Sequence, residues 1–391
     1  MRGTHSLGPS ICNDRGAMMT KTSAVLAPGA PRIGFVGLGF ATTALHLPGA
    51  RAAGAVVVGG VDAEPARRQA FSTAQSAPAF DTLDALLEKQ RPDVVVVATP
   101  PDSHAGLVQE ALAGGAHVVC EKPFVETVEQ AYEVIEAGRR ANRRIAVNQE
   151  FRFMPIFRRL AVRVGAPPTG RPVFVSCAQF MDLPPWEEEV PWRAAMPHRS
   201  LFEGGVHLID LLHCVLGRSP RSVSAHTSSG LDPGRVADAI HLVTLDYGDG
   251  VLAQITIDRL CRAGTRYVEL RVDCERESLR ASYGGHALLQ VGIRRAERPG
   301  VRLDWGPGGL AWAERGLRRQ VLGRNPRNAA AKATALLYRD TFARWRRGED
   351  AEVSGEVALE TLRVIAAAYR SAATGGRVEL GDGRSEPATP Q

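Results

Sequence analysis

The sequence contains no apolar run long enough to cross a membrane. Its longest apolar stretches, such as Val94–Ala98, fall far short of the ~20 residues that a transmembrane helix needs. Hydrophobic residues make up 44% and charged residues 23% of the 391 positions, which is the balance of a soluble globular protein. A membrane-spanning protein is therefore excluded, and the length predicts two or three domains.

Cysteine is scarce, and no two cysteines have the C-x-x-C spacing of a zinc knuckle or a redox motif. Several of them lie inside apolar patterns, where a free thiol behaves as a small hydrophobic group. We therefore expect no disulfide framework and no metal, and a reducing, cytoplasmic compartment. The six cysteines are Cys12, Cys120, Cys177, Cys214, Cys261 and Cys274.

The chain also lacks a concentrated block of charge. Its 48 Lys and Arg residues exceed its 42 Asp and Glu residues by six, and the excess lies in scattered doublets such as Arg139-Arg140 and Arg346-Arg347. A nucleic-acid-binding protein usually gathers basic residues on one face and interleaves aromatic residues with them. Aromatic residues are only 6% of this chain, so we expect a solvated basic surface and no nucleic-acid partner.

The organisation of the chain changes several times along its length. Residues 1–31 and 381–391 have no lasting periodicity, and we expect a disordered leader without a signal peptide and a disordered tail. From residue 32 to 150, short Val- and Ile-rich strands alternate with helical patterns, which predicts a doubly wound parallel sheet. The expected strands are Arg32–Val36, Ala55–Val61, Asp93–Ala98, His117–Cys120 and Arg144–Val147, and the expected helices include Pro65–Ala74, Leu83–Lys89, His104–Ala113 and Val128–Arg140.

Longer strands with partial alternation follow, so residues 151–380 are predicted to form a second, α+β domain on a largely antiparallel open sheet. The loop Tyr247–Val251 has the composition of a hairpin turn. The expected strands are Val173–Phe180, Ala239–Tyr247, Val251–Asp258, Val268–Cys274 and Ala287–Gly292, and the expected helices are Leu201–Leu216, Pro326–Arg347 and Gly355–Ala373.

A glycine-rich turn follows the first predicted strand and opens a helix. Gly37 permits the tight turn, Gly39 lets the backbone approach a pyrophosphate, and the helix N-terminus supplies free N–H groups, so we expect Phe40 and Thr42 to border the site. Thr42 replaces the third glycine of the fingerprint, and it either loosens helix packing or adds a hydroxyl near the phosphates. The pattern therefore predicts a dinucleotide site.

Asp62 ends the second strand, where a carboxylate usually accepts hydrogen bonds from the adenosine ribose. A carboxylate there repels a 2′-phosphate, which favours NAD, although Arg67 and Arg68 leave NADP possible. The alternative is a strand-end aspartate that caps the next helix.

Two further motifs follow later strands of the same sheet. The stretch Thr99-Pro100 to His104 follows the fourth strand, and Glu121-Lys122-Pro123 follows the fifth. Because open α/β sheets bind ligands at the carboxyl ends of their strands, we expect these residues to line the nucleotide site. A lysine at this edge can hold a substrate hydroxyl and lower its pKa, although a lone lysine is more often a surface residue.

Taken together, these motifs resemble the Gfo/Idh/MocA-type oxidoreductases, which include inositol and sugar dehydrogenases. The resemblance covers about residues 32–378 and implies a Rossmann nucleotide domain with a second substrate domain. It rests on ordered motifs: Gly37-x-Gly39, Thr99-Pro100 to His104, Glu121-Lys122-Pro123, Asn148 with Phe151-Arg152 and Pro155, the helix Glu203–Asp210, and Ala366–Arg377.

The resemblance also implies catalytic roles. The mid-chain helix is similar to the family pattern Asp-x-Gly-x-His, with Glu203 as a longer acid in the first position and His207 as the general acid/base. Glu203 and His207 are four residues apart on one helix face, so Glu203 is expected to orient or polarise the imidazole. The alternative is a surface or half-buried structural pair.

Substrate contacts are expected around the junction of the two domains. Phe151 and Arg152 are predicted to line the cleft, although Arg152 could instead anchor the two domains to each other. Arg193 lies in a Pro- and Trp-rich loop before the mid-chain helix, where it either lines the substrate or only helps to pin the loop.

These features predict an NAD(P)-dependent oxidoreductase that transfers a hydride between a secondary alcohol of a sugar, cyclitol or related polyol and the nicotinamide. Two alternatives are an NAD-dependent glycoside hydrolase that works by transient oxidation and a non-catalytic nucleotide-binding regulator. The resemblance further implies a homodimer or homotetramer joined through the uncovered face of the second sheet.

Overall fold

The structure is a computed structural model of the whole chain. It describes residues 25–182, 191–194, 196, 198–230, 238–262, 267–284, 286–293, 299–306, 308–316 and 318–381. The predicted leader before residue 25, the predicted tail after residue 381 and part of the Pro- and Trp-rich loop lie outside these residues.

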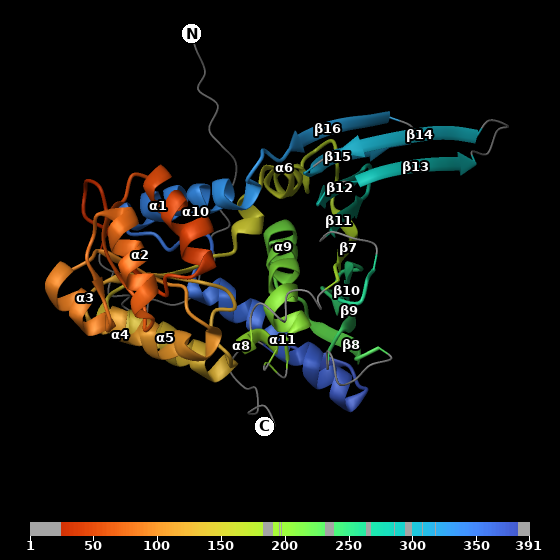
Figure 1. Cartoon of the computed structure of the whole chain (residues 1–391). Helices are drawn as coiled ribbons and strands as arrows, with labels where there is room; N and C mark the ends of the chain where they lie inside the picture. The colour runs from red at the N-terminus through yellow and green to blue at the C-terminus, as the bar shows by residue number, and fades with distance from the viewer. Residues whose placement is uncertain are drawn as a thin grey trace, which may run out of the picture.

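The N-terminal part is built on a six-stranded parallel sheet, as predicted (Figure 1). Its strand order, β3-β2-β1-β4-β5-β6, is the doubly wound order with the reversal between β1 and β4. Strand β3 was not predicted, because two residues carry no periodicity. The strands are β1 Arg32–Val36, β2 Val56–Val61, β3 Ala79–Phe80, β4 Val94–Val97, β5 His117–Cys120 and β6 Ile145–Val147.

Helices pack on both faces of this sheet and begin close to the predicted positions. Helix α5 starts with a capping box, in which Thr127 accepts from the Gln130 backbone N–H and the Gln130 side chain accepts in return. The helical elements are η1 Thr42–His46, α1 Leu47–Ala52, α2 Pro65–Gln75, α3 Leu83–Gln90, η2 Pro101–Ser103, α4 His104–Ala113 and α5 Val128–Ala141.

The C-terminal part contains a nine-stranded sheet in the order β16-β15-β12-β11-β7-β10-β9-β8-β17. It is mostly antiparallel, as predicted, but β7 and β10 pair in parallel. The predicted hairpin is confirmed, since Tyr247 N–H donates to the Val251 carbonyl at 3.0 Å. The strands are β7 Pro172–Phe180, β8 Ser222–Ser228, β9 Ile240–Asp246, β10 Leu252–Asp258, β11 Tyr267–Cys274, β12 Ser278–Tyr283, β15 Leu310–Arg315, β16 Arg318–Arg324 and β17 Val378–Glu379.

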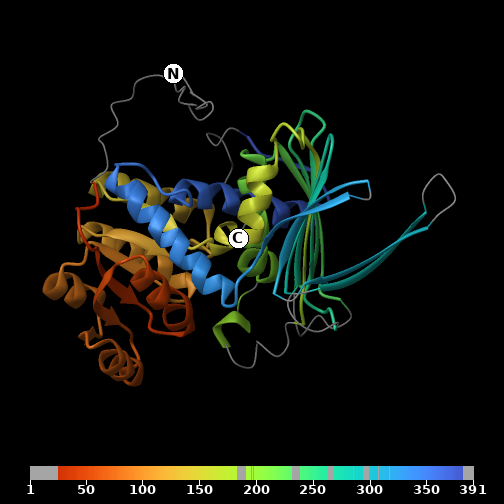
Figure 2. The ribbon, with the colours of Figure 1, turned by 90° about the horizontal axis from the view of Figure 1, so that it is seen from above.

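The predicted strand Ala287–Gly292 does not belong to this sheet. It lies in β13 His286–Ile293, which pairs only with β14 Pro299–Gly306 among the described strands. Figures 1 and 2 show this two-stranded ribbon projecting from the body of the molecule. Period-two alternation identifies a strand but not the sheet that it joins, which explains the difference.

Helices cover one face of the nine-stranded sheet, and Figure 2 shows no described helix on its other face. The covering elements include α6 Pro155–Arg163, α9 Val206–Leu216 and α11 Gly355–Thr374. On the uncovered face Leu242 and Leu252 are each 46% exposed. No helix among the described residues is long and apolar enough to span a bilayer.

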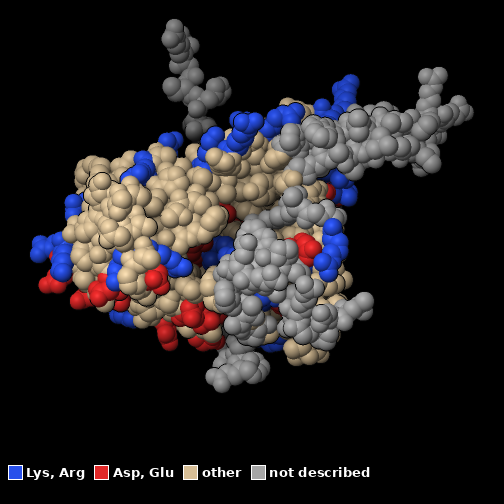
Figure 3. All heavy atoms as spheres, in the orientation of Figure 1, with Lys and Arg blue, Asp and Glu red and all other residues tan. Residues whose placement is uncertain are grey.

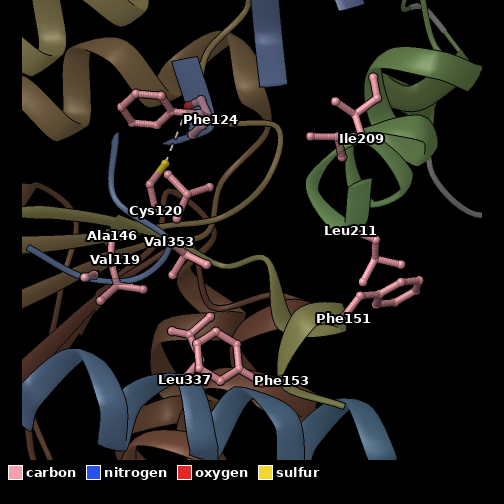
Figure 4. Close-up of a cluster of buried hydrophobic side chains, with 14 of the residues drawn as sticks. Val119, Cys120, Phe124, Ala146, Phe151, Phe153, Ile209, Leu211, Leu337 and Val353 are labelled. Carbon is pink, nitrogen blue, oxygen red and sulfur yellow. Dashed lines mark hydrogen bonds between the residues drawn. The ribbon is translucent and has the colours of Figure 1, made fainter. Parts of the chain in front are cut away.

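Helix α10, Ala329–Arg346, ties the C-terminal part to the nucleotide-binding part. It packs against α1, and Figure 4 shows Leu337 of α10 beside Phe153. The predicted leader extends too far, because Leu26 is buried and its N–H donates to the Trp345 carbonyl at 3.2 Å. Residues 25–31 are therefore part of the folded structure along α10.

Candidate active site

The glycine turn after β1 has the geometry that a nucleotide cradle needs. Gly37 has a φ of 84°, and a Cβ built there would lie 2.6 Å from the Ala98 carbonyl oxygen. A Cβ built on Gly39 would meet no atom within 4 Å, so the backbone there faces open space. Phe40 is 78% exposed at the same turn. The open space beside Gly39 fits a pyrophosphate, which the sequence predicted.

The Thr42 hydroxyl does not point toward the expected position of the phosphates. The side chain is buried, and Thr42 Oγ1 donates to the Gly37 carbonyl at 2.5 Å. Thr42 therefore braces the turn from inside. The first helical turns, Thr42–His46, have π-helical hydrogen bonding, in agreement with a loosened helix start at this position.

Asp62 braces the same turn from the end of β2. Its carboxylate accepts from the Leu38 N–H at 2.8 Å and from the Glu64 N–H at 2.9 Å. Arg67 lies 3.6 Å from the carboxylate, and Arg68 donates to the Asp62 carbonyl. Asp62 thus ties the glycine turn to Glu64, the residue before α2, but it does not cap this helix, because the N-cap of α2 is Glu64 and no side chain caps it.

His104 is a correction to the predicted cofactor contacts. It is fully buried, and its ring nitrogens lie 2.9 Å from the Thr99 carbonyl and 2.9 Å from the Pro123 carbonyl. It therefore ties the loop after β4, which contains Thr99 and Pro100, to the loop after β5. No face of the imidazole is left for a nucleotide because the ring is enclosed between these two loops.

Lys122 lies at the centre of the site. Its Nζ donates to the Glu203 Oε1 at 2.8 Å and to the Glu203 carbonyl at 3.1 Å. Arg193 on α8, Pro191–Ala194, approaches the same carboxylate at 3.5 Å. Burial alone would raise the pKa of Glu203, but the charges of Lys122 and Arg193 hold that pKa well below its ordinary value. Glu203 is therefore an anion shared by two cations.

This arrangement differs from the predicted Glu203–His207 pair. The Glu203 carboxylate turns toward Lys122, and His207 Nδ1 instead lies 3.1 Å from Gln149 Oε1 and 4.0 Å from Glu150. The reason is the start of the helix: η4, Ser200–Gly205, is a π-helix, so spacing of four residues no longer places the two side chains as in an α-helix.

Phe151 stacks on His207, which is itself only 2% exposed. The phenyl ring is 1% exposed and stacks on the imidazole with ring centroids 4.2 Å apart and a 10° angle between planes. Figure 4 shows Phe151 directed toward α9, beside Leu211. The predicted substrate contact of Phe151 is thus replaced by a contact that fixes the plane of the imidazole.

Arg152 is a second correction, in favour of the structural alternative. It is 5% exposed, its Nε donates to Asp210 Oδ2 at 2.9 Å, and its NH1 donates to the Glu352 carbonyl at 3.2 Å. Burial would lower the pKa of Arg152, but Asp210 raises it above the ordinary value. Arg152 therefore anchors η3, Glu150–Phe153, to α9 and does not reach a substrate.

Several residues of the site were not predicted from the sequence. Gln149 holds His207, and Asn148 Nδ2 donates to Glu121 Oε1 at 2.7 Å. His46 Nε2 lies 2.8 Å from the same Glu121 oxygen. Asn148 was recognised as part of a family motif, but Gln149 and His46 have no local pattern that would identify them, because their partners are 58 and 75 residues away.

The arrangement brings a cation, an anion and an imidazole to the carboxyl edge of the parallel sheet. Lys122 connects to Glu203 directly, and Glu121, Asn148 and Gln149 connect the Lys122 loop to His207. In the middle of the face shown in Figure 3, blue and red side chains lie in a hollow. Among the described residues, no cluster of three or more His, Cys, Asp or Glu could hold a metal ion. Such a site can bind a hydroxyl and transfer its proton.

Comparison with known families agrees with this geometry. Residues 31–149 match the profile of the oxidoreductase family with an NAD-binding Rossmann fold, and residues 157–280 match the GFO/IDH/MocA C-terminal domain.

Two relatives extend over most of the chain. Inositol 2-dehydrogenase 4 of Saccharopolyspora erythraea is 30% identical over 71% of this chain and 80% of its own length. D-apiose dehydrogenase of Paraburkholderia graminis is 26% identical over 84% of each chain.

A solved oxidoreductase from Agrobacterium radiobacter, in complex with NAD+, L-tartaric acid and magnesium, has a similar fold. It superposes with a TM-score of 0.76 at 18% identity and covers 89% of this chain and 98% of its own. The two profile matches, the 30% identical relative and the cradle with its lysine lead to one conclusion: the chain belongs to the Gfo/Idh/MocA family and is an NAD(P)-dependent oxidoreductase.

Proposed function

We propose that the protein oxidises a secondary alcohol of a sugar, cyclitol or related polyol, with Lys122 and His207 as its catalytic residues. The observation that supports this most is the position of Lys122 Nζ, which lies 2.8 Å from Glu203 and follows β5 at the same sheet edge as the glycine turn, with β4 between β5 and β1. The named activities of the relatives, inositol and D-apiose dehydrogenases, support the substrate class.

Each catalytic group has a defined task. Lys122 donates a hydrogen bond to the reacting hydroxyl and stabilises the developing alkoxide, because its ammonium is fixed and positively charged beside the site. His207 receives the hydroxyl proton, and the Phe151 stack with the Gln149 hydrogen bond fixes its orientation. When NAD is bound, it supplies the hydride acceptor.

Arg193 is proposed to contact the substrate. Its side chain is 30% exposed, and its Nε is buried without a hydrogen-bond partner among the described residues. A guanidinium with an unused donor next to Lys122 suits a hydroxyl or a carboxylate of the substrate. Glu203 holds both cations in place and is proposed to position Lys122 in preference to polarising His207.

We propose NAD over NADP as the cofactor. The Asp62 carboxylate is ordered beside the turn by two backbone N–H groups and lies where it would meet the adenosine ribose, and it would repel a 2′-phosphate. Arg67, 60% exposed, is the residue whose movement would weaken this preference.

The test is a screen of the cofactor-depleted protein over a panel of sugars and cyclitols with NAD and NADP, followed at 340 nm. We expect turnover with a polyol and NAD, and Lys122→Ala should lower kcat by about 100-fold or more. Lys332→Ala, which changes an exposed lysine on α10, is the matched control. Wild-type rates for Lys122→Ala would overturn the role of Lys122.

The same screen separates the alternative functions. Release of nitrophenol from a nitrophenyl glycoside without accumulation of NADH would indicate a glycoside hydrolase that oxidises its substrate transiently. A non-catalytic nucleotide-binding regulator would show no turnover. It would bind the nucleotide tightly, and neither Lys122→Ala nor His207→Asn would weaken that binding.

We also propose a homodimer or homotetramer joined through the uncovered face of the nine-stranded sheet. Leu242 and Leu252 are exposed there, and Phe174 lies opposite Leu252 in the register.

The domain limits 32–150 and 151–380 remain our proposal, as does a cytoplasmic location. The free thiols of Cys120, Cys177, Cys214, Cys261 and Cys274 suit a reducing compartment.

A further inference from the structure

A chain of buried polar side chains runs from helix α10 to the loop that contains Lys122. Tyr338 Oη lies 2.8 Å from His46 Nδ1, and His46 Nε2 lies 2.8 Å from Glu121 Oε1. Tyr338 and His46 are fully buried, and Glu121 is 8% exposed. The function proposed above gives these three side chains no task.

The Glu121 carboxylate fixes one end of this chain. An ionised carboxylate only accepts hydrogen bonds, so His46 donates from Nε2 to Glu121, while its Nδ1 pairs with the Tyr338 hydroxyl. Burial alone would raise the pKa of Glu121, but His46 and then Lys122 lower that pKa to about 2. The carboxylate is therefore ionised at neutral pH with its donors in place.

Glu121 receives three hydrogen bonds that fix the Lys122 loop. Besides His46, Asn148 donates to Oε1 at 2.7 Å and the Lys122 backbone N–H donates to Oε2 at 3.0 Å. The last contact orients the peptide from which the catalytic lysine side chain starts. These three contacts restrict rotation of the carboxylate, and the contact with the Lys122 N–H restricts the Lys122 backbone as well.

The two outer members of the chain come from elements that otherwise have separate tasks. His46 ends η1, which begins at the nucleotide turn, and Tyr338 belongs to α10 of the C-terminal part. Helix α10 packs along α1 and η1, so a shift of this helix would move Tyr338 and change the hydrogen bond to His46.

We propose that Tyr338, His46 and Glu121 are positioning residues for Lys122, and that through them the catalytic lysine is held in register by helix α10. The proposal rests on the role of Lys122 in the function proposed above. It implies that deleting one hydroxyl on α10 changes catalysis without removing any group that touches substrate or nucleotide.

The matched pair of variants is Tyr338→Phe and Tyr247→Phe. Tyr247 is 1% exposed, and its hydroxyl has no hydrogen-bond partner among the described side chains, so it controls for loss of a buried tyrosine hydroxyl. We expect Tyr338→Phe to lower kcat about tenfold and Glu121→Gln about 100-fold, with KM for NAD changed less than twofold. Tyr247→Phe should leave both constants unchanged.

Rescue separates positioning from packing. His46→Gln retains a donor that can reach Glu121, whereas His46→Leu retains only volume, so His46→Gln should keep about tenfold more activity. Equal kcat values for His46→Gln and His46→Leu would overturn the proposal. A fall in kcat in these variants that is matched by an equal fall in NADH affinity would also overturn it.

A measurement without turnover makes the result independent of the proposed function. The chain has only four lysines, Lys21, Lys89, Lys122 and Lys332, so acetylation at each can be followed by mass spectrometry. We expect Tyr338→Phe and Glu121→Gln to raise the labelling rate of Lys122 at least threefold relative to Lys332, and Tyr247→Phe to leave it unchanged. An unchanged Lys122 rate in both variants would contradict the proposal. If the wild type oxidises no polyol while this rate still changes, only the proposed function fails.

Discussion

At the scale of single residues, two histidines outside the site, the buried His117 and the half-buried His213, have lowered pKa values. His117 stacks on Trp345 with ring centroids 4.9 Å apart, and its Nδ1 accepts from the Arg144 N–H. Burial, and then Arg143 and Arg144, lower the pKa of His117 from 6.5 to about 4. Burial, and then Arg152, lower the pKa of His213 to about 4 as well.

These shifts predict a loss of stability in mild acid. Above pH 6.5 neither state binds the protons, but between pH 6.5 and 4 the unfolded state binds them and the folded state does not. Stability therefore falls as pH falls through this window, by about 2 kcal/mol per histidine between pH 7 and 5. Between pH 7 and pH 5, His117→Gln should lose about half as much unfolding free energy as the two histidines together contribute in the wild type, as measured by urea unfolding at both pH values. His226→Gln, at an exposed histidine, is the control, and a pH dependence of His117→Gln equal to that of the wild type would contradict this assignment.

The sequence predicted Lys122, Glu203 and His207 because each belongs to a motif with local spacing. It could not predict that Glu203 pairs with Lys122, 81 residues away, because that pairing depends on the π-helical turn of η4. Arg152 and His104 were wrongly predicted to contact ligands. The position of a residue in the sequence indicates that it lies near the site, but it does not indicate where its side chain points.

At the scale of elements, two glycines in the turn between β1 and η1 have different expected roles: Gly37 is needed for folding and for nucleotide binding, and Gly39 for nucleotide binding alone. Gly37→Ala introduces a Cβ against the Ala98 carbonyl at a φ of 84°, so it should lower the unfolding temperature as well as NADH affinity. Gly39→Ala adds a methyl group to open space, so the protein should fold normally and bind NADH at least about tenfold more weakly. Fluorescence titration and thermal unfolding measure both, and normal affinity in Gly39→Ala would place the pyrophosphate elsewhere.

The anchor between η3 and α9 makes a second prediction for elements. Arg152→Met leaves Asp210 as an unpaired buried carboxylate, and breaking a buried pair in this way costs about 3–5 kcal/mol. Arg171→Met breaks a pair with Glu275 in which Arg171 is 86% exposed, so its effect should be much smaller. Urea unfolding compares the two variants, and equal losses of stability would show that burial of the Arg152 pair has no special importance.

The sequence predicted most elements because apolar runs and caps are local signals. The parallel strands β1, β2, β4, β5 and β6 were found within one or two residues, whereas β3, β8, β12 and β14–β17 were not predicted. Strands such as β16, with its exposed and half-buried residues, have little apolar periodicity to detect. Their pairing is decided by neighbours distant in the chain.

At the scale of the whole molecule, the uncovered sheet face predicts self-association. Leu242→Lys combined with Leu252→Lys places charges on this face and should shift the protein toward the monomer in size-exclusion chromatography with light scattering. Val162→Lys, at a 76% exposed position on α6, is the control and should leave the mass unchanged. A monomeric wild type, or an unchanged mass in the double variant, would contradict the proposed interface.

The central claim is that Lys122 and His207 act on one substrate molecule at the nucleotide edge of the parallel sheet. The most direct measurement is deuterium transfer, by mass spectrometry, from a polyol labelled at its carbinol carbon to NAD. The wild type should form deuterated NADH, and Lys122→Ala and His207→Asn should each form it at least about 100-fold more slowly while binding NADH normally. Transfer at the wild-type rate in either variant would contradict the account.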